Sequence, residues 1–136
     1  MKKFTIALLL FVSLASCKKT LEEKARDIVL DAMTSGKWEI TKFTVDGNNI
    51  TSDFAGYSFQ YHKNETVDAI KDGSVQSTGS WSGDAANMRI SANFTNVSEP
   101  LLLINGQWSI TNNSWTFVEA SQTVGSQVKT LRLDKL

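Results

Sequence analysis

The chain has 136 residues, a length that suits one domain, and it contains one cysteine, one histidine and one proline. Its 14 basic residues balance 14 acidic ones, and no basic patch emerges, which argues against a nucleic-acid-binding protein. Many Gly, Asn, Ser and Thr residues separate short runs in which apolar and polar residues alternate. This pattern is typical of an all-β domain.

The N-terminus has the features of an export signal. Two lysines precede an apolar run, Phe4 to Leu14, of 11 residues. This run is too short to span a bilayer but suits a signal segment. Small residues follow in Leu14-Ala15-Ser16-Cys17. This stretch resembles the lipobox of bacterial lipoproteins, which implies a diacylglycerol thioether on Cys17, cleavage before it and acylation of the new N-terminus. The alternative is an ordinary secretory signal followed by an incidental cysteine.

The lipobox resemblance divides the first part of the chain and predicts a location. Residues 1–16 are expected to be removed, and residues 17–19 to form the lipidated cysteine and its tether. The remaining chain then carries 12 basic and 14 acidic residues, a net charge of −2. Residue 18 is lysine, not the aspartate that commonly retains such proteins at the inner membrane. We therefore expect a bacterial envelope protein anchored in the outer membrane.

A single helix is expected over residues 20–35. Thr20 and Glu23 have the spacing of a capping box, and Gly36 provides a stop signal. One face of this helix is apolar, comprising Leu21, Ala25, Ile28, Val29, Ala32 and Met33. That face could cover a partner or a membrane surface, but packing against the following domain is the simpler interpretation.

After Gly36 the apolar period changes from helical to alternating, which predicts strands. The expected strands cover residues 37–45, 57–63, 66–71, 74–82, 87–94, 101–111, 114–120 and 127–134. In the first strand the apolar parity changes, which predicts a bulge near Thr41-Lys42. Asp72-Gly73 is a strong hairpin signal.

Asn105-Gly106 leaves two interpretations open. These residues could close a hairpin, or a long strand could continue through them from 101 to 111. The long strand is favoured because it yields eight strands. Eight strands can close into an up-and-down barrel without sheet edges. The expected fold is therefore an all-β, eight-stranded antiparallel up-and-down barrel preceded by one short helix.

Several motifs in residues 36–136 resemble the lipocalin family. Gly36-Lys37-Trp38 resembles the G-x-W signature, in which the tryptophan closes one end of the barrel. Arg132 occupies the place of a last-strand arginine that packs across that tryptophan by a cation–π contact. The resemblance is to small lipocalin-like domains of Gram-negative lipoproteins, and it implies a binding barrel. The Thr-Asp-Tyr turn and a C-terminal helix of lipocalins are absent, and the region is short for that family.

A barrel of eight strands encloses its own side chains or one small ligand. The aromatic and large side chains expected to line a binding site are Phe43, Tyr57, Phe59, Tyr61, Trp81, Met88, Trp108, Trp115 and Phe117. Gly36, Trp38 and Arg132 are expected to close the barrel. A small apolar or amphipathic ligand at the membrane is the preferred function. The alternative is a protein-interaction or inhibitory module with a filled core and an envelope protein as partner.

Catalytic chemistry has little support in the sequence. His62 is the only histidine, and its position on a predicted strand indicates a surface residue. Glu65 and Asp68 lie near it, but one histidine and two carboxylates lack a recognised metal-site spacing. The nucleophile-elbow, P-loop and Rossmann motifs are absent. We therefore expect neither an enzyme nor a cofactor or metal site.

Overall fold

The computed structural model describes residue 21 and residues 23–136. The predictions that fall on residues 1–20, including the signal, the lipidated Cys17 and the Thr20 cap, lie outside the described residues. A helix, the N-terminal helix, covers residues 21 and 23–34. The elements that follow it are β1 (Trp38–Val45), β2 (Asn48–Asn49), the 3₁₀ helix η1 (Thr51–Phe54), β3 (Tyr57–Tyr61), β4 (Thr66–Lys71), β5 (Ser74–Asp84), β6 (Arg89–Asn93), the 3₁₀ helix η2 (Leu101–Ile104), β7 (Gly106–Asn113), β8 (Phe117–Val124) and β9 (Gln127–Lys135).

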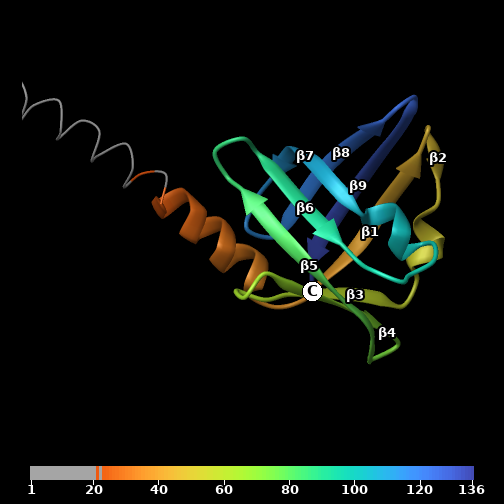
Figure 1. Cartoon of the computed structure of the whole chain (residues 1–136), viewed down its shortest axis with the longest axis horizontal. Coiled ribbons are helices and arrows are strands. Elements are labelled where there is room, and N and C mark those ends of the chain that lie inside the picture. The colour runs from red at the N-terminus through yellow and green to blue at the C-terminus, as the bar shows by residue number, and fades with distance from the viewer. Residues whose placement is uncertain (1–20, 22) are drawn as a thin grey trace, which may run out of the picture.

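The strands form a closed antiparallel barrel (Figure 1). Each strand from β3 to β8 pairs with the next along the chain, and β1 pairs with both β3 and β9. These eight strands complete the circle, while the two-residue β2 is an extra strand hydrogen-bonded to β1. The predicted eight-stranded up-and-down barrel with one N-terminal helix is confirmed. Closure satisfies backbone groups that an open sheet would leave at its edges.

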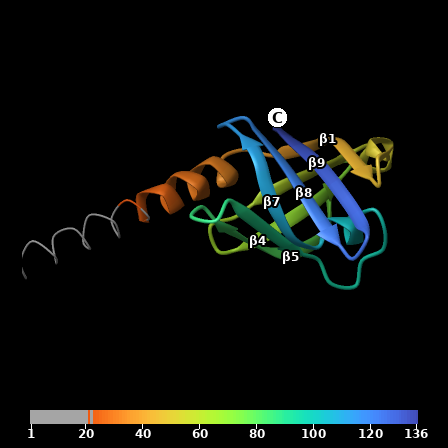
Figure 2. The ribbon, with the colours of Figure 1, turned by 90° about the horizontal axis from the view of Figure 1, so that it is seen from above.

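The N-terminal helix projects from one end of the barrel (Figures 1 and 2). Its described residues fall within the predicted range 20–35. Gly36 follows it with a φ of +79°, a left-handed conformation that suits glycine after a helix. The last turns of the helix pack on the barrel, with Met33 buried and Val29 and Leu30 partly buried against the core. Within the described residues, no helix is long and apolar enough to cross a membrane.

The local irregularities of the sheet match the sequence in two places. The pairing of β1 with β9 shifts between Ile40 and Lys42, which is the predicted bulge. Asp72 and Gly73 both have positive φ values, 50° and 85°, and join β4 to β5 in the predicted two-residue turn. Positive φ at both central positions matches the twist of a hairpin.

The predicted strand over residues 101–111 is wrong in its first part. Leu101–Ile104 forms η2, and β7 begins only at Gly106. Leu101 and Ile104 are the buried residues of η2, and a spacing of three residues places them on one side of a 3₁₀ helix. Gly106 has a φ of +106°, which a regular strand does not contain.

The up-and-down order gives the barrel two distinct ends. At the helix end lie the N-terminal helix and the β3–β4, β5–β6 and β7–β8 turns. At the far end lie η1, η2 and the β4–β5 and β8–β9 turns. Phe54 of η1 and Leu101 and Ile104 of η2 are buried in the core. The two 3₁₀ helices therefore fill the far end.

A buried lysine also contributes to the far end. Lys129 is 6% exposed, and its Nζ donates a hydrogen bond to the Leu103 carbonyl over 2.9 Å. The same ammonium lies 5.7 Å from the centre of the Trp108 ring. Burial lowers the pKa of Lys129. Its stem and head group thus occupy space that a ligand entering from this end would need.

Gly79 marks a close approach between β5 and the chain beside it. A Cβ atom at this position would lie 2.5 Å from the Asn93 carbonyl oxygen and 2.8 Å from Phe94 Cδ1. Such distances are too short for non-bonded contact, so a side chain here would displace β6. Gly83, on the same strand, would meet its nearest neighbours at 3.5 Å, an ordinary contact.

Candidate functional site

The centre of the barrel is packed with side chains. Six of the predicted lining residues are buried there: Phe43, Tyr57, Phe59, Tyr61, Trp81 and Trp108. Phe43 lies 4.8 Å from Phe54 and 5.8 Å from Trp108 between ring centroids. The void left beside Tyr61 and Trp108 has a volume of about 20 Å³, about enough for one water molecule. These aromatic residues fill the barrel and do not line an open chamber.

Tyr61 and Trp81 are two of these buried aromatic residues, and each also has a polar atom. Their rings meet edge to face at 5.2 Å, and the Trp81 indole N–H donates to the His62 carbonyl over 2.8 Å. Desolvation by burial raises the pKa of the Tyr61 hydroxyl above its ordinary value. Tyr61 is therefore neutral over the whole physiological range.

Three other predicted lining residues lie elsewhere. Met88 is in the β5–β6 turn and 43% exposed, and Trp115 is in the β7–β8 turn and 59% exposed. Phe117 belongs to β8, whose inward positions are occupied by Val118, Ala120 and Gln122. Alternation therefore turns Phe117 to the outside. The expectation of an inward Trp115 and Phe117 is wrong because β8 begins later and has the opposite parity.

Arg132 also lies on the outside of the barrel, between the inward Leu131 and Leu133. Its guanidinium stacks over Phe117 at 4.3 Å and forms salt bridges with Glu119 and Asp134 at 2.7 and 2.9 Å. Hydrogen bonds from Arg132 lower the pKa of Asp134. The predicted contact of Arg132 with Trp38 is therefore wrong.

Lys135 takes that position instead. It has the inward parity of Leu131 and Leu133, and its Nζ lies 4.9 Å from the centre of the Trp38 ring. The same ammonium donates to the Ala32 carbonyl over 3.0 Å and to Ser35 Oγ over 2.9 Å. A cation beside the last carbonyls of a helix also interacts favourably with the helix dipole. Lys135 thus joins the last strand to the end of the N-terminal helix.

Trp38 itself is fully buried at the helix end. Its indole N–H donates to the Met33 carbonyl over 2.9 Å, which satisfies a carbonyl that the end of a helix leaves without a partner. Met33 is 3% exposed. Met33, in the last turn of the N-terminal helix, and Trp38, at the start of β1, are therefore buried together at this end of the barrel.

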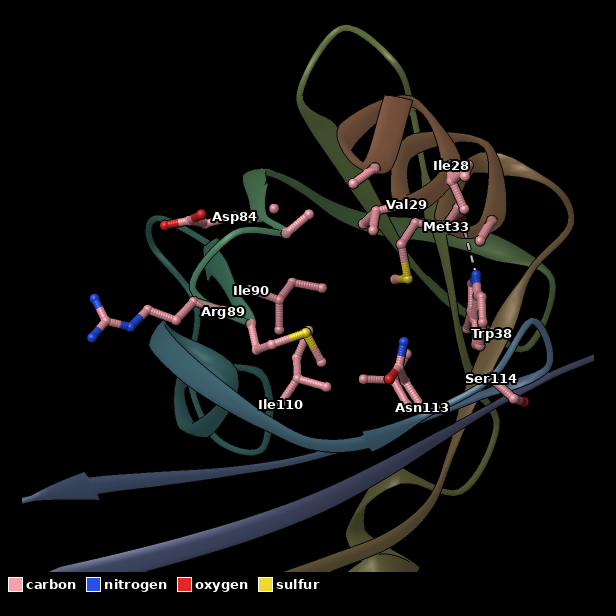
Figure 3. A pocket seen from close by; sticks show the side chains of 16 residues that line it. Ile28, Val29, Met33, Trp38, Asp84, Arg89, Ile90, Ile110, Asn113 and Ser114 are labelled. Carbon is pink, nitrogen blue, oxygen red and sulfur yellow. Dashed lines mark hydrogen bonds between the residues drawn. The ribbon is translucent and has the colours of Figure 1, made fainter. Parts of the chain in front are cut away.

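A mostly apolar pocket of about 290 Å³ lies between the N-terminal helix and the barrel (Figure 3). We call it the helix pocket. The N-terminal helix contributes Ala25, Ile28, Val29, Ala32 and Met33, and the barrel contributes Trp38, Gly83, Asp84, Ala85, Met88, Arg89, Ile90, Ile110, Asn113, Ser114 and Val118. Its volume is at the lower end of the range for small-molecule sites. Of the nine residues predicted to line a ligand site, only Met88 lines this pocket.

The polar side chains that line the helix pocket differ in direction. Figure 3 shows the carboxylate of Asp84 and the guanidinium of Arg89 directed away from the pocket, whereas the side chain of Asn113 points into it. Asp84 is held by Asn87, whose side-chain amide donates to it over 2.8 Å and lowers its pKa. The pocket therefore offers apolar contact and one amide, a combination that suits an apolar or weakly amphipathic molecule.

Two other hollows are less suited to such a molecule. One, of about 330 Å³, is predominantly polar and lies at the far end beside Tyr57, Lys71 and residues 96–101. The other, of about 320 Å³, is an open depression over β5, β6 and the start of β7. Of the three, the helix pocket has the most apolar lining.

His62 takes part in a small surface cluster. Its Nε2 lies 2.8 Å from Asp68 Oδ2, and Thr78 Oγ1 donates to the other Asp68 oxygen over 2.7 Å. The hydrogen bond from Thr78 and then that from His62 lower the pKa of Asp68. His62 and Thr78 each form a hydrogen bond with Asp68, so the His62 ring is not placed to act on the Thr78 hydroxyl. Within the described residues, no group of three or more metal-ligating side chains is found.

The helix pocket was missed because its two walls come from distant parts of the sequence. The apolar face of the helix was recognised, and it includes Ile28, Val29 and Met33. Its partner residues, Ile90 and Ile110, look like ordinary inward strand positions. One pattern in the sequence could have predicted the pocket. The helix has a long apolar face, but the barrel already contains enough aromatic residues to fill its own interior.

The comparisons with known proteins add a structural neighbour. No protein-family model matches the chain, and no curated protein matches it. A crystal structure of a DUF4847 family protein from Bacteroides vulgatus ATCC 8482 is similar in fold, with a TM-score of 0.54. The sequences are 14% identical, and the match covers 78% of this chain and 96% of that one. At this identity the likeness concerns the fold alone.

Proposed function

We propose that the protein is a lipid-anchored, lipocalin-like lipoprotein that binds a small apolar or amphipathic molecule in the helix pocket. The observation that carries this proposal is the pocket of about 290 Å³ between the N-terminal helix and a barrel whose interior is otherwise filled. The filled interior distinguishes this site from a ligand chamber in the middle of the barrel. The barrel would then serve as a rigid support, and the helix as one wall of the site.

The anchor in this proposal is Cys17. Leu14-Ala15-Ser16-Cys17 follows an apolar run of signal length, and thioether-linked acyl chains at that position would hold the protein stably in a membrane. With lysine at position 18, the outer membrane of a bacterial envelope is the proposed location. Ligand exchange would then take place close to lipid.

A binding role is proposed in preference to catalysis because of the chemistry of the helix pocket. Its titratable side chains among the described residues are Asp84 and Arg89. Asp84 is tied to Asn87 within its own turn, and both charged groups point away from the apolar space. General acid–base catalysis needs such groups within hydrogen-bond reach of the reacting atoms.

The proposal can be tested with a palmitic acid analogue that carries a diazirine on its chain. Membranes containing the full protein would be irradiated with the analogue, and cross-linked peptides identified by mass spectrometry. We expect adducts on the residues around Ile28, Met88 and Ile110. Ile110→Trp should fill the pocket and remove the adducts, whereas Val75→Trp, at an exposed site on the far half of β5, should leave them. Adducts that persist unchanged in Ile110→Trp would refute the proposal.

The alternative function, a protein-interaction module, is favoured by one observation. The void beside Tyr61 and Trp108 in the barrel interior is only about 20 Å³, so the fold itself can act as a solid scaffold for surface contacts. Affinity capture from detergent-solubilised envelopes would test it. A specific envelope protein recovered by the wild type, together with no adducts from the acyl probe, would favour the interaction module.

A further inference from the structure

Large exposed apolar side chains lie on the N-terminal helix and on the turns that contribute to the helix pocket. Ile28 and Met88 line it, yet they are 51% and 43% exposed. Trp115 directly follows the lining residue Ser114 and is 59% exposed, and Leu21 at the start of the helix is 67% exposed. We call Leu21, Ile28, Met88 and Trp115 the docking face. They come from the helix and from two turns of the same barrel end (Figures 1 and 2).

Trp115 is unlike the other three tryptophans. Trp38, Trp81 and Trp108 are at most 3% exposed, and the indole N–H of each donates to a backbone carbonyl within the fold. Trp115 has more than half of its surface in solvent. A tryptophan in such a position suits the boundary between lipid and water, because its ring is apolar and its N–H is polar.

The position of the docking face relative to Cys17 identifies what can cover it. Three residues lie between Cys17 and Leu21, and the four residue steps from one to the other span at most about 14 Å in a fully extended chain. A lipid on Cys17 would therefore keep the start of the N-terminal helix within that distance of the membrane surface. The docking face includes this part of the helix.

The N-terminal helix, which carries part of the docking face, has a small excess of negative charge. Residues 21–34 include four acidic residues, Glu22, Glu23, Asp27 and Asp31, and two basic ones, Lys24 and Arg26. Lys63 of the β3–β4 turn forms a salt bridge with Asp31 at 3.0 Å. This excess would not favour binding to an anionic surface. Contact with lipid would depend mainly on apolar burial and on the tether.

We propose that the docking face lies on the bilayer in which Cys17 is anchored, with the mouth of the helix pocket directed toward the lipid. This inference rests on the lipid anchor of the proposed function. It adds a fixed orientation of the barrel, an interfacial role for Trp115 and a route by which an acyl chain passes from the membrane into the pocket without crossing water.

The test uses the mature lipidated protein in vesicles of phosphatidylethanolamine and phosphatidylglycerol, some of whose acyl chains carry bromine. Bromine quenches tryptophan fluorescence only at short range. Because Trp115 is the exposed tryptophan, we expect quenching in the wild type and its loss in Trp115→Phe. The matched control adds Val128→Trp to Trp115→Phe, which places a tryptophan at an exposed position of the far end. That tryptophan should escape quenching.

The possible outcomes test the proposed orientation of the barrel separately from the proposed lipid anchor. Protein that floats with the vesicles while Trp115 is not quenched would overturn the docking face and leave the lipid anchor intact. Equal quenching of tryptophans at positions 115 and 128 would mean free tumbling on the tether and would also overturn it. Protein that does not float would refute the anchor, and the orientation with it. Cross-linking of two copies through position 115, without quenching, would assign the face to self-association.

Discussion

Replacing Lys135 with methionine should loosen the N-terminal helix without opening the barrel core. Methionine keeps most of the apolar stem but loses the ammonium that contacts the Ala32 carbonyl, Ser35 Oγ and the Trp38 ring. Hydrogen bonds of a charged group contribute about 1.5–3 kcal/mol when well shielded, and a cation–π contact adds about 0.5–1 kcal/mol at an exposed site. Lys135 is only partly buried, so we expect a net loss of about 1–2 kcal/mol, toward the lower values.

A second lysine provides the matched control. Lys71 lies over the Tyr57 ring at the same distance, 4.9 Å, but at the far end of the barrel. Lys71→Met should therefore cost only the cation–π contribution, about 0.5 kcal/mol. Urea denaturation followed by tryptophan fluorescence gives both free energies of unfolding. Amide hydrogen exchange should be faster in residues 29–34 of Lys135→Met alone. Equal losses in the two variants, with unchanged helix exchange, would refute the assigned role of Lys135.

Three further predictions follow from the sequence and the fold. Cys17→Ala should abolish incorporation of radiolabelled palmitate, and labelling that persists would refute lipidation at this residue. Gly79→Ala should lower the free energy of unfolding by about 1–3 kcal/mol because its Cβ would clash with the neighbouring chain, whereas Gly83→Ala should be tolerated. The lowered pKa of Asp68 gives stability that is present above its ordinary value of 3.8 and is lost as the pH falls through and below it. Thr78→Val should flatten that acid dependence in pH titrations of stability, and an unchanged profile would contradict the assignment.

Alternation along the strands predicted most of the strands of the barrel. Tyr57, Phe59 and Tyr61 are all buried, as their spacing of two requires. The bulge near Lys42 could also be predicted, because a change of apolar parity within one strand requires an extra residue. These features depend on near neighbours in the chain, and local patterns report them reliably.

The errors occurred where two periods fit the same residues. Leu101–Ile104 is apolar throughout, so its sequence cannot distinguish a strand from a 3₁₀ turn. At the start of β8 the largest apolar residues, Trp115 and Phe117, suggested one parity, while the smaller Val118 and Ala120 are the ones that face inward. The space available inside the barrel decided the outcome, because the large aromatics of other strands already occupy it.

The candidate site could be predicted only in part. The apolar face of the helix was visible in the spacing of Ile28 and Met33, but its distance from Ile110 is a property of the folded chain. The volume that remains between them depends on how closely Met33 and Trp38 bring the helix to the barrel. No pattern within either segment encodes that separation.

The plugging of the far end by Phe54, Leu101 and Ile104 has a kinetic consequence for the helix pocket. A molecule bound in that pocket would enter and leave at the helix end, where the N-terminal helix forms one wall. Residence time would therefore follow the undocking of a single helix, and the barrel strands could remain paired throughout. Substitutions confined to the inner face of that helix can change the shape of the helix pocket and the rate of ligand exchange while the barrel stays unchanged.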